Sequence, residues 1–371
     1  MSGCKQAKHP ARASRNRSQH PNRAAGAIRR LQAYPQKLSD IGLRASRIYS
    51  KEGPGGQPVT VSPMKKLAAL LLTIMPLACA ADDSAVHKQE LLWQKLAHSV
   101  EALDAGLDGV MGVAVLDLKT GREWMYHANE VFPTASTIKL AVLAELYHQQ
   151  ELSLEGKTGG AKLTDLYTVR KEDMVPSSAI LGNLTPGVTV LTNRDLAAAV
   201  VAVSDNSASN ILTNRLGMAR INAMLDGLNL KQTRIRRLMM DLEAAKQGRE
   251  NVATPHELVL LLQAIYQNKL FRPELTQDLL NLLSTPKSSS IPRFLPEDLK
   301  IANKPGELFG VRCDAGIVFV PNHPFAIAIM TTYDRDGRAA EQTISQVALL
   351  AWRLFDTLSV SSEYGRAMTA R

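Results

Sequence analysis

Two serines and a lysine, each inside a short polar motif, follow one another at wide spacing along this chain. The motifs are Ser136-Thr137-Ile138-Lys139, Ser204-Asp205-Asn206 and Lys304-Pro305-Gly306. Each motif alone has an ordinary explanation, and Ser-x-x-Lys recurs at Ser2/Lys5, Ser62/Lys65 and Ser284/Lys287, about as often as composition would give by chance. The ordered set instead predicts one site, in which a lysine rather than a histidine activates a serine nucleophile.

The first motif stands at the expected start of a helix. Pro133 and Thr134 precede it, and the apolar run 140–146 follows it. Ser136 would then lie in the first turn, with Lys139 three residues on and on the same face. Burial beside apolar neighbours and a second cation such as Lys304 would lower the pKa of the Lys139 amine, so that it could deprotonate Ser136. The Ser136 N–H, free at the helix start, could bind a developing oxyanion.

The second motif has two interpretations. Ser, Asp and Asn between two apolar runs are typical of a helix N-cap. Alternatively, Ser204 relays a proton among Lys304, the leaving nitrogen and Ser136, while Asn206 orients Lys139 and the substrate amide. The sequence alone leaves both interpretations open.

The third motif opens an expected strand. Gly306 would allow a substrate backbone to approach closely, and alternation places the N–H of residues 305 and 307 on one strand edge. Pro305 cannot donate, so the strand is expected to have an open edge there. The Glu307 N–H would then be the second oxyanion donor.

Taken together, these motifs resemble those of the class A β-lactamases and related serine penicillin-recognising enzymes. The likeness extends from about residue 91 to about residue 358, including Val113–Gly121, Ile291–Pro296 and Thr254-Pro255. The resemblance implies a two-lobed α/β fold in which a helical lobe packs against a five-stranded antiparallel sheet flanked by the N- and C-terminal helices. The sheet lobe would comprise residues 85–133 and 286–371, the helical lobe residues 134–285, and the site would lie between them.

Two departures from the family pattern bear on chemistry. Pro305 replaces the usual threonine, so Lys304 and Arg312 must do more to hold a substrate carboxylate. In addition, the resemblance places the family's deacylating glutamate at Met239, and a thioether cannot accept a proton. Glu243 is the substitute base that we expect; Asp241 is a second candidate, and both are equally well explained as surface carboxylates at a helix start.

The N-terminal region predicts export. Residues 1–63 carry 12 Lys/Arg and 2 Asp/Glu without apolar periodicity, which is typical of disorder. Residues 64–80 have the basic start, short apolar core and small-residue cleavage site of a secretory signal peptide. We therefore expect residues 1–63 to be a misassigned start, and residues 81–371 to be a periplasmic or secreted domain. Removing both segments changes the net charge from +9 to −3, which argues against nucleic-acid binding, and leaves Cys313 as the one cysteine, so no internal disulfide is expected.

The remaining features are consistent with one monomeric domain without a cofactor. Four amphipathic runs predict helices at 90–103, 254–267, 274–283 and 340–358, with the first and last packed together on the sheet. His256-Glu257 begins a zinc-protease-like pattern, but Leu260 stands where its second histidine belongs. We expect no metal and no stable membrane span after processing.

Three functions remain open. The leading one is a serine hydrolase that opens the amide of β-lactams through a Ser136 acyl-enzyme with Lys139 as base, as in antibiotic resistance. The second is a penicillin-binding D-Ala-D-Ala peptidase or esterase that deacylates β-lactams slowly. The third, of a different class, is a non-catalytic binder of peptidoglycan fragments.

Overall fold

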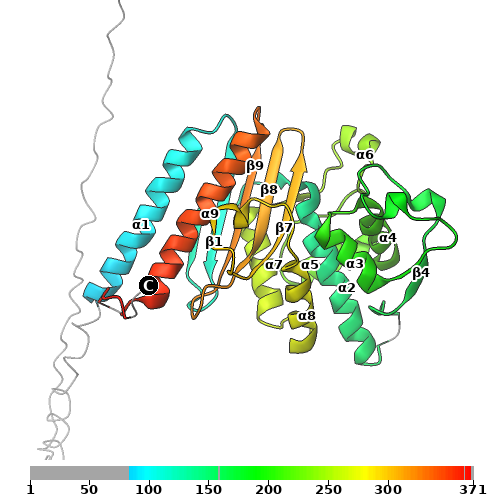
Figure 1. Cartoon of the computed structure of the whole chain (residues 1–371), viewed down its shortest axis with the longest axis horizontal. Helices are drawn as coiled ribbons and strands as arrows, with labels where there is room; N and C mark the ends of the chain where they lie inside the picture. Colours follow the sequence, from blue (N-terminus) through cyan, green and yellow to red (C-terminus); the bar gives the residue numbers. More distant parts are fainter. Residues whose placement is uncertain (1–82, 158, 363, 369–371) are drawn as a thin grey trace, which may run out of the picture. The chain divides into compact units, whose positions relative to one another are not determined.

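A computed structural model describes residues 83–157, 159–362 and 364–368. Its main sheet is antiparallel, with the strand order β2-β1-β9-β8-β7 (Figure 1). The strands of this sheet are β1 (Val110–Asp117), β2 (Glu123–Tyr126), β7 (Ile301–Leu308), β8 (Val311–Val318) and β9 (Phe325–Thr332). Two come from the N-terminal part of the chain and three from the C-terminal part, as predicted.

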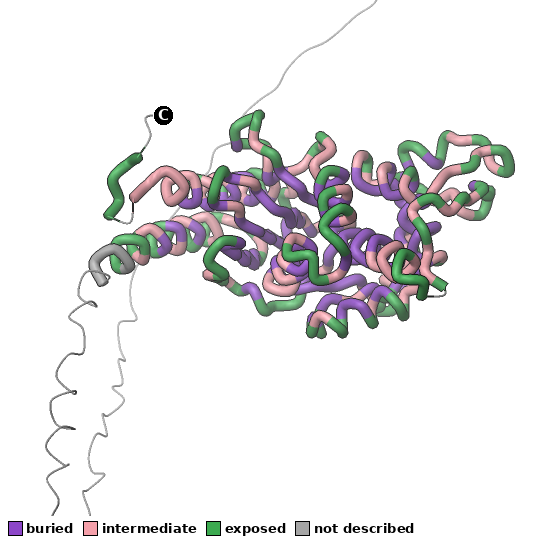
Figure 2. The backbone as a smooth tube through the Cα atoms, turned by 90° about the horizontal axis from the view of Figure 1, so that it is seen from below, coloured by how far each residue is buried: buried purple, intermediate pink, exposed green. Residues whose placement is uncertain are grey.

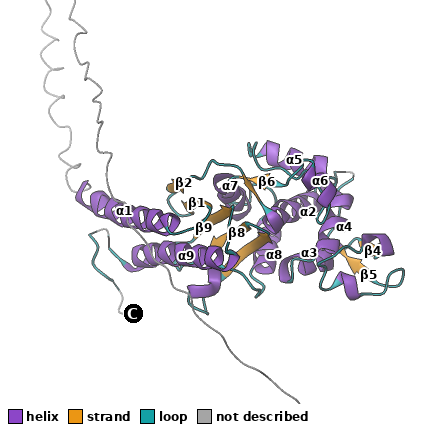
Figure 3. Ribbon diagram, turned by 90° about the horizontal axis from the view of Figure 1, so that it is seen from above, coloured by secondary structure: helices purple, strands orange, loops and turns teal. Residues whose placement is uncertain are grey.

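Two long helices cover one face of this sheet. The helices α1 (Asp83–Ala105) and α9 (Gly337–Val360) lie side by side in Figures 1 and 3. Trp93 of α1 meets Phe355 of α9 edge to face, with ring centroids 5.6 Å apart. Both rings belong to a buried apolar cluster with Val113 and Val115 of β1. The predicted pairing of the first and last helices on the sheet is therefore confirmed.

The opposite face packs against a helical lobe. Ala114 and Leu116, which alternate with Val113 and Val115 along β1, belong to the large cluster of this lobe because successive strand residues point to opposite faces. Figure 2 shows the buried residues concentrated between these layers. The helices of the lobe are α2 (Lys139–Leu154), α3 (Asn193–Ala202), α4 (Asn206–Leu216), α5 (Met218–Gly227), α6 (Leu242–Lys246), α7 (Pro255–Tyr266) and α8 (Pro273–Leu283).

Short elements connect these helices. Two small sheets pair β3 (Phe132–Pro133) with β6 (Val252–Ala253), and β4 (Leu166–Thr168) with β5 (Val190–Thr192). Single 3₁₀ turns are η2 (Ala135–Ile138), η3 (Lys171–Asp173), η4 (Leu181–Asn183) and η5 (Ile291–Phe294). Among the described residues, the helices are too short or too polar to cross a membrane.

Strand β7 joins the two lobes. It forms one edge of the sheet, as Pro305 predicted, and it runs beside η2. A Cβ atom added to Gly306 would lie 2.7 Å from Thr134 O, Thr137 N and Thr137 Oγ1. The Thr137 hydroxyl also donates to Lys304 O at 3.3 Å. The absence of a side chain at residue 306 thus lets β7 approach η2, and the close approach of a substrate that the sequence suggested stays a prediction.

Candidate active site

Ser136 occupies the 3₁₀ turn η2, immediately ahead of α2, which begins at Lys139. The turn is tight because Ala135 adopts a left-handed backbone conformation with φ 47°, which is uncommon for a residue with a Cβ atom. The first hydrogen bond of the turn runs from Thr137 N to Thr134 O at 2.9 Å. The Ser136 N–H precedes it and is available to an external acceptor. Ser136 is half-buried and lines a cavity.

Lys139 is fully buried at the start of α2. Its Nζ atom donates to Ser204 O at 2.6 Å, Asn206 Oδ1 at 2.8 Å and Ser204 Oγ at 3.2 Å. These three acceptors match the three protons of an ammonium group, and Ser136 is not among them. Burial, and then the neighbouring charge of Lys304, hold the pKa of Lys139 well below its usual value. Once neutral, the amine has a lone pair that can accept the Ser136 proton.

Ser204-Asp205-Asn206 contains the helix N-cap that one of its two interpretations predicted, and both flanking residues contact Lys139; the proton relay stays a prediction. Asp205 is the N-cap of α4, with Oδ1 accepting from Ala208 N at 3.0 Å. Its other oxygen accepts from the N–H groups of Ile180 and Leu181, both at 2.9 Å. This cap fixes Ser204, which has φ 55°, and places its oxygen atoms beside the Lys139 amine. The central residue, Asp205, therefore stabilises the helix start, while its neighbours Ser204 and Asn206 accept hydrogen bonds from Lys139.

Lys304 reaches the same hydroxyl from the sheet. It is fully buried in β7 and donates from Nζ to Ser204 Oγ at 3.0 Å and to Pro305 O at 2.8 Å. Burial lowers the pKa of Lys304 to about 7, although the nearby Asp314 favours the charged form. Two lysines with lowered pKa values on one serine hydroxyl form a path along which a proton can move.

The β7 edge supplies the other predicted groups. Because strand N–H groups alternate in direction, the N–H of Glu307 points to the same edge as the ring nitrogen of Pro305. Both residues line the cavity together with Ser136 and Gly306. The cavity has a volume of about 440 Å³. It is lined by Ser136, Val201, Ala202, Val203, Ser204, Lys287, Ser288, Ser289, Ser290, Arg293, Lys304, Pro305, Gly306, Glu307, Arg312, Cys313 and Glu341.

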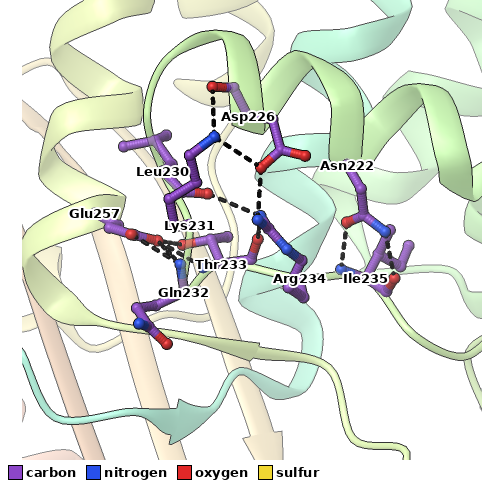
Figure 4. A network of polar contacts seen from close by, with 9 residues as sticks. All are labelled: Asn222, Asp226, Leu230, Lys231, Gln232, Thr233, Arg234, Ile235 and Glu257. Carbon is purple, nitrogen blue, oxygen red and sulfur yellow. Dashed lines mark hydrogen bonds and ion pairs between the residues drawn. The ribbon is translucent and has the colours of Figure 1, made fainter.

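The loop between α5 and α7 carries Met239, and polar contacts hold it at its start and in its middle. Near its start, Glu257 accepts from Gln232 N and from Thr233 N and Oγ1, and Arg234 donates to Asp226 Oδ1 at 2.6 Å (Figure 4). In its middle, the peptide groups of Met239 make two hydrogen bonds, N to Asn210 Oδ1 at 2.7 Å and O from Asn210 Nδ2 at 3.0 Å. Met239 is buried but does not line the cavity.

The structure gives no support to Glu243 as a catalytic base. Its side chain is 75 % exposed on α6 and forms an ion pair with Lys246 at 2.7 Å. Asp241 caps the same helix, accepting from Ala244 N at 2.9 Å. Neither carboxylate lines the cavity. The short helix α6 explains the placement of both carboxylates. Asp241 is its N-cap, and Glu243 pairs with Lys246 three residues later on the exposed face.

Some residues of the site were missed in the sequence. Asp314 is fully buried behind β7 and accepts from Asn303 Nδ2 at 2.8 Å and from two backbone N–H groups of the 290–291 segment. Lys287 donates to Leu283 O at 2.6 Å, and burial lowers its pKa to about 8. Its sequence signal was the Ser284/Lys287 copy of Ser-x-x-Lys, but Ser284 Oγ donates to Leu280 O in α8 and Lys287 Nζ donates to Leu283 O and Asn303 Oδ1 instead.

The described residues contain no cluster of side chains suited to a metal ion. His256 lies in the first turn of α7, whose N-cap is Thr254. Cys313 is a free, buried thiol on β8. The chemistry available in the cavity is therefore that of a serine hydroxyl, two buried lysine amines and backbone donors, an arrangement suited to acyl transfer.

Comparison with known proteins agrees with this fold. The sequence profile of the Beta-lactamase enzyme family matches residues 95–355, and the chain belongs to that family. Beta-lactamase CARB-4 of Pseudomonas aeruginosa is 28 % identical over 238 residues, covering 61 % of this chain and 78 % of that protein. Beta-lactamase PSE-4 of the same organism is 25 % identical over 305 residues, 81 % of this chain and all of that protein.

Solved structures include both β-lactamases and a penicillin-binding protein. A beta-lactamase from Sphaerobacter thermophilus has a TM-score of 0.63 at 27 % identity, covering 71 % of this chain and 97 % of that one. The structure of PBP-A has the same TM-score at 25 % identity, covering 71 % and 96 %. A point mutant of PBP-A is known as an acyl-enzyme complex with penicillin G. The family thus comprises class A β-lactamase-like and penicillin-binding serine hydrolases.

Proposed function

We propose that this protein is an exported serine hydrolase whose Ser136 is acylated by the strained amide of β-lactams. The observation that carries the proposal is the convergence of Lys139 and Lys304 on Ser204 Oγ in the cavity that Ser136 lines. Burying a second lysine amine beside the first costs folding free energy. This pair of lysines is therefore better explained by a function than by stabilisation of the fold.

The residues define a sequence of steps. Neutral Lys139 takes the proton of Ser136 Oγ, which attacks the carbonyl carbon of the lactam. The carbonyl oxygen becomes an oxyanion bound by the N–H groups of Ser136 and Glu307. The C–N bond then breaks, and the leaving nitrogen takes a proton from Ser204 Oγ, which is replenished from Lys304 or Lys139. The product is an ester of Ser136, and Asn206 holds the Lys139 amine in place throughout.

Hydrolysis of that ester requires an activated water. The carboxylates that line the cavity are Glu307 and Glu341, and neither comes from the loop that carries Met239. Glu341 already accepts from two arginines. This observation favours the second candidate function, a penicillin-binding peptidase or esterase that forms the acyl-enzyme readily and deacylates β-lactams slowly.

Labelling with a fluorescent penicillin tests the proposal. We expect one equivalent of adduct on the peptide containing Ser136 in the wild type. A Ser136→Ala variant should carry no adduct, and an unfolding temperature equal to that of the wild type would show that this variant is folded. Undiminished labelling of that variant would refute the assignment of the nucleophile. Absence of labelling in the wild type would favour the non-catalytic binder of peptidoglycan fragments, against which the complete set of Ser136, Lys139, Ser204 and Lys304 argues.

A further inference from the structure

A second cavity lies in the helical lobe, between α2 and α5, which pack against each other (Figure 3). Its volume is about 490 Å³, and the loops at 159–160 and 269–270 complete its walls. The residues that line it differ throughout from those that line the cavity of Ser136. None of the steps proposed for acylation uses this second cavity, so its composition needs an explanation of its own.

The second cavity combines polar and apolar side chains. Residues three, four and seven positions apart share one face of a helix. Four residues of α2 that line the cavity have this spacing, namely Glu145, His148, Gln149 and Leu152. Met224 of α5 and Leu270 add apolar side chains to the walls. Such a pocket, mainly apolar with a few convergent polar groups, is typical of a site for a small molecule.

Glu145 places a carboxylate at the buried end of this cavity. Its side chain is 4 % exposed; the carboxylate accepts from Gln149 Nε2 at 2.8 Å and lies 3.2 Å from His148 Nδ1. Gln149 is itself fixed, because its Oε1 accepts from Ala161 N at 3.1 Å. Within the described part of the chain, neither a lysine nor an arginine pairs with Glu145. A buried carboxylate without a permanent cation beside it costs free energy, and two donors leave part of its accepting capacity unused.

His148 adds a second acceptor beside Glu145. An ionised carboxylate can only accept, so the imidazole donates from Nδ1, and in the neutral ring Nε2 is left as an acceptor. The His148 side chain is 29 % exposed and lines the cavity, and no contact among the described residues uses its Nε2 atom. A carboxylate and an imidazole nitrogen side by side favour a cationic donor such as an ammonium group.

The exposed end of the cavity has the opposite charge. Arg220, near the start of α5, and Lys269, which follows α7, are both exposed and line the cavity. Arg220 donates from Nη1 to Gly159 O at 3.1 Å, which holds its guanidinium at this end. Exposed basic groups of this kind attract an anion. The cavity therefore has acceptors at its buried end, cations at its exposed end and apolar side chains along its walls.

We propose that this second cavity binds a small zwitterion with an apolar body. Its ammonium group lies at Glu145 and His148, and its carboxylate lies at Arg220 and Lys269. Compounds of this class are ω-amino acids and short apolar peptides that enter with the amino end first. The site is separate from the acylation proposed for Ser136, since the two cavities share no lining residue.

The compounds ε-aminohexanoate, hexylamine and hexanoate form a matched set of probes that differ in their charged ends. Calorimetric titration would measure the affinity of each for the wild type, Glu145→Gln, Arg220→Gln and Ala223→Trp. Ala223 is an exposed residue of α5 that lines the cavity, so the larger side chain would fill it. Glu151→Gln is the matched control, because Glu151 lies on α2 outside the cavity and pairs with Arg272 at 2.8 Å. Thermal unfolding reports whether each variant is folded.

We expect ε-aminohexanoate to bind the wild type and the Glu151→Gln variant with equal affinity. Glu145→Gln should weaken its binding about 10- to 100-fold, the effect of losing a hydrogen bond to a charged group. Arg220→Gln should weaken it only about two- to fivefold, because this residue is exposed, and should leave the binding of hexylamine unchanged. Hexanoate, which lacks the ammonium group, should bind the wild type about as weakly as the zwitterion binds Glu145→Gln. Ala223→Trp should abolish binding.

Absence of binding to the wild type would overturn the inference, and so would equal affinities of the wild type, Glu145→Gln and Ala223→Trp. If Glu145→Gln does not fold, Ala223→Trp decides alone. Competition between ε-aminohexanoate and a fluorescent penicillin for Ser136 would also overturn it, because the ligand would then occupy the other cavity. Binding is measured here without acylation, so a protein that penicillin does not label would refute the proposed function and not this inference.

Discussion

Lys139 and Lys304 approach the same atom from different lobes: their Nζ atoms lie 3.2 and 3.0 Å from Ser204 Oγ. One lysine begins α2 of the helical lobe and the other belongs to the edge strand of the sheet. Both amines are fully buried. Packing of the two lobes therefore places two lysine amines within reach of one hydroxyl. Burial favours the neutral form of each amine, which reduces the electrostatic repulsion between them.

The buried amine of Lys304 makes stability depend on pH. Its pKa is about 7 in the folded protein and 10.5 as the reference for an unfolded chain. Between these values the unfolded chain binds more protons than the folded protein, so the free energy of unfolding rises with pH across that window. The free-energy cost of burying the protonated Lys304 amine is fully present below pH 7. Lys304→Met should remove this dependence, which amounts to about 1.4 kcal/mol per pH unit at most.

Urea unfolding of wild type and Lys304→Met between pH 6.5 and 9.5 measures the effect. We expect the variant to be the more stable protein at pH 7, with its advantage shrinking as pH rises. Lys119→Met, at an exposed position, serves as the control. A stability difference that stays constant over this range would show that Lys304 is not held neutral by the fold.

Deacylation of β-lactams should be slow. Rapid mixing with a chromogenic cephalosporin should give a burst of one equivalent followed by slow turnover. Because Glu243 is exposed and Asp241 caps α6, Glu243→Gln and Asp241→Asn should leave both phases within about twofold of wild type. Fast turnover that is abolished by Glu243→Gln would restore that residue as the base, and fast turnover that survives both changes would contradict our interpretation of the loop.

A carboxylate introduced at Met239 should accelerate turnover. Asn210 fixes both peptide groups of this residue, and a positioned general base contributes about 10²–10⁴-fold. Because Met239 is buried and does not line the cavity, we expect Met239→Glu to shorten the life of the acyl-enzyme by only a small part of this factor, as measured from the slow phase after the burst. Met239→Gln is the matched control of nearly equal size. Equal rates in the two variants would exclude a role for a base at this position.

Gly306→Ala should destabilise the junction between the lobes. The added methyl group would meet backbone atoms of Thr134 and Thr137 at 2.7 Å, and overpacking of this kind costs about 1–3 kcal/mol. Gly227→Ala has open space around the new atom and should be neutral or slightly stabilising. Unfolding temperatures of the two variants check the contrast, and equal values would refute the close packing of β7 on η2.

Processing is predicted from residues 64–80, which lie outside the described residues. N-terminal sequencing of exported protein should find a first residue at or near Ala81. Mature protein that begins with the basic segment 1–63 would contradict the proposed signal peptide. Cell fractionation of the same culture tests whether the enzyme is periplasmic or secreted.

Much of the fold could be predicted because its signals are local. Apolar periodicity located α7 and α8 within a residue or two, and Pro305 marked β7 as an edge strand. The order of the three motifs likewise predicted which hydroxyl and which amines belong to one site. Such features depend on residues close in sequence, or on residue types that tolerate few environments, so the sequence alone determined them.

Only the tertiary structure decided how the side chains are used. Gly306 makes room for the backbone of η2, Arg312 donates to the β7–β8 hairpin and to Glu341, and Glu243 faces solvent. These outcomes depend on which groups from distant segments meet when the two lobes pack. Hydrogen bonds between such groups leave no periodic or regularly spaced pattern in the sequence, so the sequence could not predict them.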